Sequence, residues 1–239
     1  IEVLLDEAQK CDIKVFVSAG FYGVWSQPIT NMTSPIVRDR AFAAMKILYE
    51  QYGKYKSFYG WYFPDETCVK RYFSKEFIKY VNEYSEYGKS FNSGLKTLIA
   101  PFGTNMLSAD DYYVQQLRDI DVDIMAYQDE IGVRKSSPED TGAYYEALKN
   151  AHDRAGRSVL WADMEIFEFE GDVYKSALLP ANIKRVKKQL QAISPYVEEV
   201  LCYQYLGMMN KPSTTAFCGH PTSISFYNDY KKLLSQLYK

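Results

Sequence analysis

Short apolar runs alternate along the chain with longer segments in which apolar residues recur at helical spacing. Runs of this length are typical of buried strands, and the spacing between them is typical of amphipathic helices. Regular alternation of the two indicates strand–helix units that form a parallel sheet. The six expected strands are Lys14–Ala19, Ser57–Phe63, Lys96–Pro101, Val122–Gln128, Ser158–Met164 and Glu199–Tyr205.

Capping residues mark the ends of the helices between these strands. Ser34 is followed by proline, which favours the first position of a helix. Ser74 precedes another helical run, and Ser108 and Ser137 begin sequences that resemble capping boxes with Asp in place of Glu. The last internal helix is expected to end at Ser194, because proline follows it.

Residues 1–10 form one more predicted helix, with Val3, Leu4, Ala8 and Cys11 on its apolar side. A six-stranded open sheet and the last six units of a (β/α)8 TIM barrel both fit this order. The barrel is favoured, because polar and aromatic residues follow nearly every strand, as they do when all strand ends line one mouth. We therefore expect an α/β fold in which residues 1–239 are a single TIM-barrel domain without its first two strands.

Two of the expected strands end in carboxylates, at Asp65-Glu66 and at Asp163 and Glu165. The interior of a buried strand excludes charge, so acids at the strand ends are better placed for chemistry than for packing. Paired carboxylates hydrolyse glycosides: one protonates the leaving oxygen, and the other attacks the anomeric carbon or activates water. Glu66 and Glu165 are the predicted catalytic pair.

Aromatic residues make up 16% of the chain, with Tyr 22, Phe 13 and Trp 3. Tyr and Trp combine a flat apolar face with a polar group, which suits a surface that binds a hydroxylated ligand. For single loop acids such as Asp65, Asp129 and Glu130, a solvated charge or a helix cap is an equally good interpretation. The residues near strand ends that we expect to bind the carbohydrate are Phe21, Trp25, Tyr62, Asp65, Phe102, Gln128, Asp129, Asp163, Gln204 and Tyr205.

Charge and motifs exclude several other classes. The net charge is −2 without a basic block, so nucleic-acid binding is not expected, and no apolar stretch approaches membrane-spanning length. No G-x-G-x-x-G or P-loop pattern follows a strand, and no cofactor is expected. Cys202 and Cys218 are the one pair placed to form a disulfide, although four free thiols are the favoured expectation. His152 is expected to pack and His220 to cap the last helix.

Two alternatives to hydrolysis stay open at this stage. The first is a non-catalytic carbohydrate-binding barrel that keeps the cleft without turnover. The second is a metal-dependent barrel enzyme that binds Mg²⁺ or Mn²⁺ through carboxylate oxygens, which are the ligands these ions prefer. The candidate ligands for that ion are Asp65, Glu66, Asp129, Asp163 and Glu165.

At these positions the chain resembles the DUF4434 family, bacterial TIM-barrel proteins common in gut Bacteroides and considered related to glycoside hydrolases. The matching stretches span nearly the whole chain. They are Gly60-Trp61-Tyr62 with Glu66, Met125-Ala126-Tyr127-Gln128-Asp129, Trp161-Ala162-Asp163-Met164-Glu165 with Phe167, and Gly219-His220.

The resemblance implies that the six strands are the third to eighth of the barrel, so that Glu66 follows strand four and Glu165 follows strand seven. By analogy with the large retaining-glycosidase clan of such barrels, it implies that Glu66 is the acid/base and Glu165 the nucleophile. The chain departs from that clan at Asp65, where the clan has Asn. The resemblance also implies a secreted, periplasmic or surface-lipoprotein location.

Overall fold

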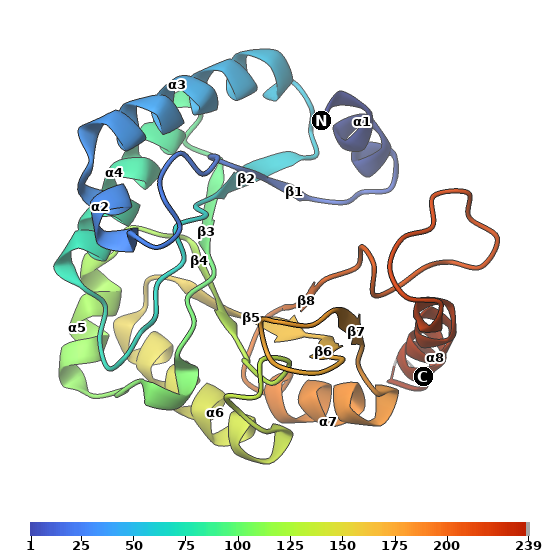
Figure 1. Cartoon of the computed structure of the whole chain (residues 1–239). Helices are drawn as coiled ribbons and strands as arrows, with labels where there is room; N and C mark the ends of the chain where they lie inside the picture. The colour runs from blue at the N-terminus through green and yellow to red at the C-terminus, as the bar shows by residue number, and fades with distance from the viewer. Residues whose placement is uncertain (238–239) are drawn as a thin grey trace. The chain divides into compact units, whose positions relative to one another are not determined.

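The protein has an α/β fold that contains all six predicted strands. A computed structural model describes residues 1–237 (Figure 1). The observed strands differ from the predicted ones by at most two residues at either end. They are β1 (Val15–Ser18), β2 (Phe58–Tyr62), β3 (Lys96–Ile99), β4 (Ile124–Gln128), β5 (Val159–Glu165) and β8 (Val200–Tyr203).

Helices separate these strands, as the alternation predicted. They are α1 (Glu2–Lys10), α2 (Pro28–Thr33), α3 (Pro35–Tyr52), α4 (Lys75–Phe91), α5 (Asp111–Asp119), α6 (Pro138–Ala155), α7 (Ile183–Ile193) and α8 (Thr222–Leu237), with a 3-10 turn η1 (Thr104–Met106).

One pair of strands was missed by the sequence analysis. β6 (Phe167–Phe169) and β7 (Leu178–Pro180) pair antiparallel after β5, with Phe169 opposite Leu178. Three residues per strand are too few to show a period, so the pattern of apolar positions did not reveal them.

The chain divides into two compact units. Unit 1 contains residues 1–102, 106–126 and 150–159, and unit 2 contains residues 103–105, 127–149 and 160–239. Unit 1 holds the strand order β1-β2-β3-β4, and unit 2 holds the end of β4 with β5 and β8. The pairings β1–β2, β2–β3, β3–β4 and β5–β8 are all parallel, as predicted for strand–helix units.

The core of unit 1 is an aromatic layer between β2 and the helices α3 and α4, which cover the same face of the strands (Figure 1). Trp61 is fully buried there, with its ring 5.0 Å from that of Phe58. Gly88 of α4 lies against the Trp61 indole, and a Cβ at Gly88 would come within 2.8 Å of the ring. The glycine therefore allows α4 to approach the strand closely.

The structure confirms most of the predicted helix ends. Ser34 accepts a hydrogen bond from the Val37 amide, and Ser74 accepts one from the Phe77 amide at 3.1 Å. The capping prediction at Ser108 was wrong by two residues, because Asp110 accepts the Tyr113 amide at 3.1 Å. The Ser108 hydroxyl instead accepts from the Arg71 guanidinium.

The N-terminal helix exists, but its predicted apolar side was right only at Ala8. α1 buries Leu5 and Ala8, whereas Val3 is 76% exposed and Leu4 is 57% exposed. The helix is anchored where the Ser57 hydroxyl donates to the Leu5 carbonyl at 2.6 Å. Because Leu4 precedes Leu5 by one residue, it lies about 100° further around the helix and misses that contact.

We predict that Gly88→Ala destabilises the protein by about 1–3 kcal/mol, because the added methyl overpacks the Trp61 contact. Gly142→Ala is the matched control, since a Cβ at this position of α6 would meet nothing closer than 3.5 Å. Alanine is a better helix former than glycine, so the control should gain up to about 1 kcal/mol. Urea unfolding measures both, and a Gly88→Ala protein as stable as the control would contradict this packing.

Candidate active site

The end of β2 places Glu66 next to Tyr62. The Phe63 amide pairs with Leu98 of β3, and Pro64 then ends the ladder because it has no N–H to donate. The Glu66 amide closes a tight turn onto the Pro64 carbonyl at 2.9 Å, and the Tyr62 hydroxyl donates to the Glu66 carboxylate at 2.7 Å. The predicted shared face of Tyr62 and Glu66 is thus a direct contact.

Asp65 lies in different surroundings, although it is the next residue in the chain. It is 8% exposed, and the side chains of Asn31 and Tyr80 lie against its carboxyl. Burial raises the pKa of Asp65, and the polar groups of Asn31 and Tyr80 beside it offset part of that effect. Asp65 is therefore surrounded by protein groups.

The predicted aromatic residues of unit 1 follow strand ends, as expected. The rings of Phe21 and Trp25 lie 5.9 Å apart in the loop after β1, and Trp25 is 76% exposed. Phe102 follows β3 and pairs through its backbone with the segment after Glu66, accepting from the Val69 amide at 2.7 Å.

Unit 2 holds a cluster of three buried carboxylates at the ends of β4 and β5. Asp129, Glu130 and Glu165 are each at most 5% exposed. Asp129 accepts the Glu165 amide at 3.0 Å, and the Glu165 carboxylate accepts the Val133 amide at 2.8 Å. These two bonds connect the loop after β4 to the end of β5.

Glu130 connects a third strand end to the same cluster. Its carboxylate accepts the Gly103 amide, after β3, at 2.7 Å and forms an ion pair with Lys135 at 3.2 Å. Glu130 also has a positive φ of 53°, which an L-residue adopts rarely. The loop is therefore built around this carboxylate, and Glu130 is no solvated charge.

Burial makes the cluster electrostatically unusual. The pKa of Glu165 rises from 4.5 to about 8, mainly because its carboxyl is desolvated and next because the negative charge of Asp129 lies close to it. Desolvation likewise raises the pKa of Asp129 to about 6, although its hydrogen bonds from the Glu165 amide and from Gln189 oppose the effect. Near neutral pH, Glu165 therefore keeps its proton while most of Asp129 is ionised.

Helix α7 supplies two partners that the sequence analysis missed. Gln189 donates to the Asp129 carboxylate at 2.7 Å and to the Glu165 carbonyl at 3.1 Å. Arg185 donates to the Glu165 carbonyl at 3.1 Å and to the Phe167 carbonyl at 2.6 Å. Gln189 lies at helical spacing between Val186 and Ile193, so a polar residue on an apolar stripe was the available signal.

The other predicted residues of unit 2 lie around this cluster or beyond it. The Asp163 carbonyl accepts the Asp129 amide at 3.1 Å, and the Gln128 carbonyl accepts the Thr104 hydroxyl at 3.3 Å. Gln204 is partly exposed and follows β8, and Tyr205 beside it is 57% exposed. Among the predicted site residues, Tyr62 is hydrogen-bonded to Glu66 in unit 1, and Asp129 is hydrogen-bonded to Glu165 in unit 2.

The predicted roles of the cysteines and histidines can be checked within residues 1–237. Cys202 and Cys218 form no disulfide with each other there. His152 is buried, with Nδ1 3.1 Å from the Ser158 carbonyl, and His220 accepts the Thr222 amide at the start of α8. Both histidines therefore have the structural roles predicted for them.

Residues 1–237 contain neither a cluster of metal-ligating side chains nor a helix that could span a membrane. No three His, Cys, Asp or Glu side chains among the described residues are arranged to hold a metal ion. The oxygens of Asp129, Glu130 and Glu165 accept from N–H donors instead. None of the described helices is long and apolar enough to cross a membrane.

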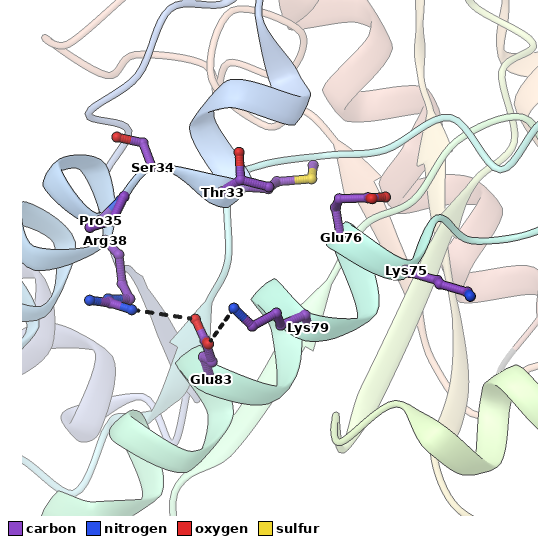
Figure 2. Close-up of a pocket in the computed structure, with 9 residues that line it drawn as sticks. Thr33, Ser34, Pro35, Arg38, Lys75, Glu76, Lys79 and Glu83 are labelled. Atoms are coloured by element: carbon purple, nitrogen blue, oxygen red, sulfur yellow. Dashed lines mark ion pairs between the residues drawn. The ribbon is translucent and has the colours of Figure 1, made fainter.

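A surface pocket of about 240 Å³ lies in the helix layer of unit 1 (Figure 2). Glu83 forms ion pairs there with Lys79 at 3.2 Å and with Arg38 at 4.0 Å. The lining residues come from α2 to α4 and from Ser34 between them, and no strand end contributes. Neither Glu66 nor Glu165 lines this pocket.

The solved structures that match this chain include glycoside hydrolases with a TIM-barrel fold. A candidate α-L-fucosidase from Bacteroides thetaiotaomicron matches with a TM-score of 0.78 and 20% identity, over 98% of this chain and 71% of its own. An endo-1,4-β-D-mannanase from Thermotoga petrophila matches with 0.62 and 12% identity, over 96% and 78%. A GH2 β-galacturonidase from Eisenbergiella tayi matches with 0.59 and 14%, over 97% and 43%.

These matches confirm the predicted fold class, an α/β TIM-barrel fold represented here by six parallel strands. The family model described as a domain of unknown function, DUF4434, matches residues 1–216, and the chain belongs to that family. This confirms the resemblance found in the sequence. Comparison with curated proteins gave no significant match.

The buried cluster predicts how stability depends on pH. Because folding raises the pKa values of Glu165 and Asp129, the folded state binds more protons than the unfolded state. The free energy of unfolding should therefore fall as pH rises, between about pH 4 and 6 for Asp129 and between about pH 4.5 and 8 for Glu165, by up to about 1.4 kcal/mol per pH unit for each group.

Glu165→Gln should remove the Glu165 part of this slope and be more stable than the wild type at pH 8.5, by several degrees in Tm. Exposed Glu170 provides the matched control, Glu170→Gln. Thermal unfolding followed across this pH range makes the measurement. Equal slopes in Glu165→Gln and in the wild type would refute the raised pKa of Glu165.

Proposed function

We propose that this protein is a glycoside hydrolase that uses Glu66 and Glu165 as its two carboxyl groups. Glu165 is the last residue of β5 and Glu66 follows β2, so both lie at the C-terminal ends of parallel strands, where TIM-barrel enzymes carry their chemistry. The observation that carries the proposal is the burial of Glu165 beside Asp129, which raises the pKa of Glu165 to about 8, because glycoside hydrolysis needs one carboxyl kept neutral and one ionised. The likeness in fold to glycoside hydrolases supports it.

The surroundings of the two carboxyls divide these roles. Glu165, with a pKa of about 8, is the proton donor to the leaving oxygen. Glu66, which is partly exposed and accepts the Tyr62 hydroxyl, is the carboxylate that attacks the anomeric carbon in a retaining mechanism. This reverses the roles that the family resemblance implies, and it follows from burial and charge.

The substrate in this proposal is a carbohydrate bound by the aromatic and polar residues at the strand ends. Phe21, Trp25 and Tyr205 are exposed and offer ring faces to a sugar, and Gln128 and Gln204 offer amide groups to its hydroxyls. Fucosides, mannosides and galacturonides are the first glycosides to test, because those are the sugars named for the structural neighbours.

We also propose that two strand–helix units outside residues 1–239 complete the barrel. β1 and β8 are the end strands of the main sheet, and each could pair with a further strand. Apolar side chains are exposed next to both of them. On α1 these are Val3 and Leu4, and on β8 they are Leu201, at 36%, and Tyr203, at 48%.

A non-catalytic carbohydrate-binding barrel is the second candidate. The observation that favours it is the 5% exposure of Glu165, which leaves little of the carboxyl open to a ligand. Binding of a glycan without turnover, unchanged by Glu66→Gln and Glu165→Gln, would establish it.

The two carboxyl roles predict different responses to the leaving group. Glu165→Gln should hydrolyse alkyl glycosides about 10²–10⁴-fold more slowly than wild type, because their leaving oxygen needs a proton. It should lose far less activity on 2,4-dinitrophenyl glycosides, which leave without protonation. Glu66→Gln should lose activity equally on both, because no nucleophile remains.

Initial rates on matched alkyl and dinitrophenyl α-L-fucosides, β-D-mannosides and β-D-galacturonides measure this difference. Glu170→Gln again serves as the control and should match wild type. If the leaving-group dependence appeared in Glu66→Gln and not in Glu165→Gln, the two roles would be the opposite of those proposed.

A further inference from the structure

The side chain of Asn31 fixes the loop that follows β1. Asn31 is 4% exposed, its Oδ1 accepts the Val24 amide at 2.9 Å, and its Nδ2 donates to the Val24 carbonyl at 3.0 Å. One side chain thereby pairs both backbone groups of Val24, whose own side chain is 53% exposed. The loop gains at this point the hydrogen bonds that a neighbouring strand would otherwise supply.

The residue before Val24 leaves room for this amide. A Cβ at Gly23 would lie 2.1 Å from both Cγ and Oδ1 of Asn31, so any other residue would push the Asn31 side chain out of place. The bonds between Asn31 and Val24 therefore require glycine at position 23. We call this arrangement of Gly23, Val24 and Asn31 the clamp.

The loop held in this way presents two aromatic rings to the outside. The Trp25 ring is 76% exposed and lies 5.9 Å from the Phe21 ring, at 55° between their planes. Trp61, by contrast, is fully buried in the core of the same unit. An exposed Trp in a loop ordered by buried hydrogen bonds is typical of a surface that receives a ligand, because the ring gains apolar contact only when that ligand binds.

The other side of the Asn31 amide lies against Asp65. Asn31 Nδ2 donates to the Val24 carbonyl at 3.0 Å, and the Asn31 side chain also acts on the buried Asp65 carboxyl, whose pKa it lowers. The two bonds with Val24 fix which end of the amide is nitrogen. The Phe21–Trp25 loop is thus connected through Asn31 to the residue that precedes Glu66.

We propose that Asn31 is a positioning residue that holds Phe21 and Trp25 as a stacking platform for a sugar ring, and that Asp65 acts through Asn31 without touching the sugar. The inference rests on the proposed function for its carbohydrate ligand, whereas the clamp itself rests on unit 1 alone. An aromatic platform favours a sugar ring with an exposed apolar face, such as that of a hexopyranose.

Hydrogen exchange at the Val24 amide tests the clamp without any ligand. Asn31→Ala and Gly23→Ala should each speed this exchange at least tenfold, and Asn31→Asp should do the same because it places an oxygen against the Val24 carbonyl and Asp65. Thr33→Ala is the control, since Thr33 is exposed on the same helix and bonds only to its own helix turn. Unchanged exchange in both Asn31→Ala and Gly23→Ala would overturn the clamp.

Calorimetric titration with mannohexaose and with hexagalacturonate tests the platform. Wild type should bind at least one of them, and Asn31→Ala, Gly23→Ala and Trp25→Ala should each weaken that binding about tenfold, or about 1.4 kcal/mol. Asp65→Ala should weaken binding and speed Val24 exchange together. Weaker binding with normal exchange would mean that Asp65 touches the sugar, which would overturn its positioning role.

Failure of the aromatic platform and failure of the proposed function would give different results. If wild type binds neither hexasaccharide, the carbohydrate platform is overturned together with the sugar ligand of the proposed function, while the exchange data still decide the clamp. If wild type binds and Asn31→Ala binds equally well despite fast Val24 exchange, the platform is overturned and the proposed function is not.

Discussion

The structure of unit 2 depends on keeping three carboxyl groups in a space that excludes water. Glu165, Asp129 and Glu130 are held there by backbone N–H donors from two loops and from the end of β5, and by Gln189. A buried ionised carboxylate costs several kcal/mol unless it is paired, so such a cluster keeps a proton instead. The same constraint orders the loops, opposes stability at alkaline pH and provides a neutral acid at a strand end.

The fold was predictable from the sequence because its signals are local. Each strand of the main sheet is a short apolar run, and Ser34 and Ser74 cap their helices where the sequence placed them. The errors arose where tertiary contacts decide. Leu5, and not Leu4, is the residue of α1 that contacts Ser57, and no feature of residues 1–10 encodes that choice.

The site was predictable in part, for the same reason. Acids at strand ends pointed to Glu66 and Glu165, but the sequence could not distinguish Asp65, which is enclosed by Asn31 and Tyr80, from its neighbour Glu66. The partners Arg185 and Gln189 lie on a helix about 20 residues later, so only the folded chain brings them to β5. The division of roles between the carboxyls depends on burial, which the sequence does not contain.

The most direct test of this account is the titration of Glu165 itself. ¹³C NMR of protein labelled at the Glu side-chain carboxyl carbons, with Glu165→Gln used to assign the signal, reports the protonation of this one group. The account predicts an apparent pKa near 8 for Glu165 in the folded protein, well above the exposed glutamates in the same spectrum. A Glu165 signal that titrates together with those exposed glutamates, near pH 4.3, would contradict it.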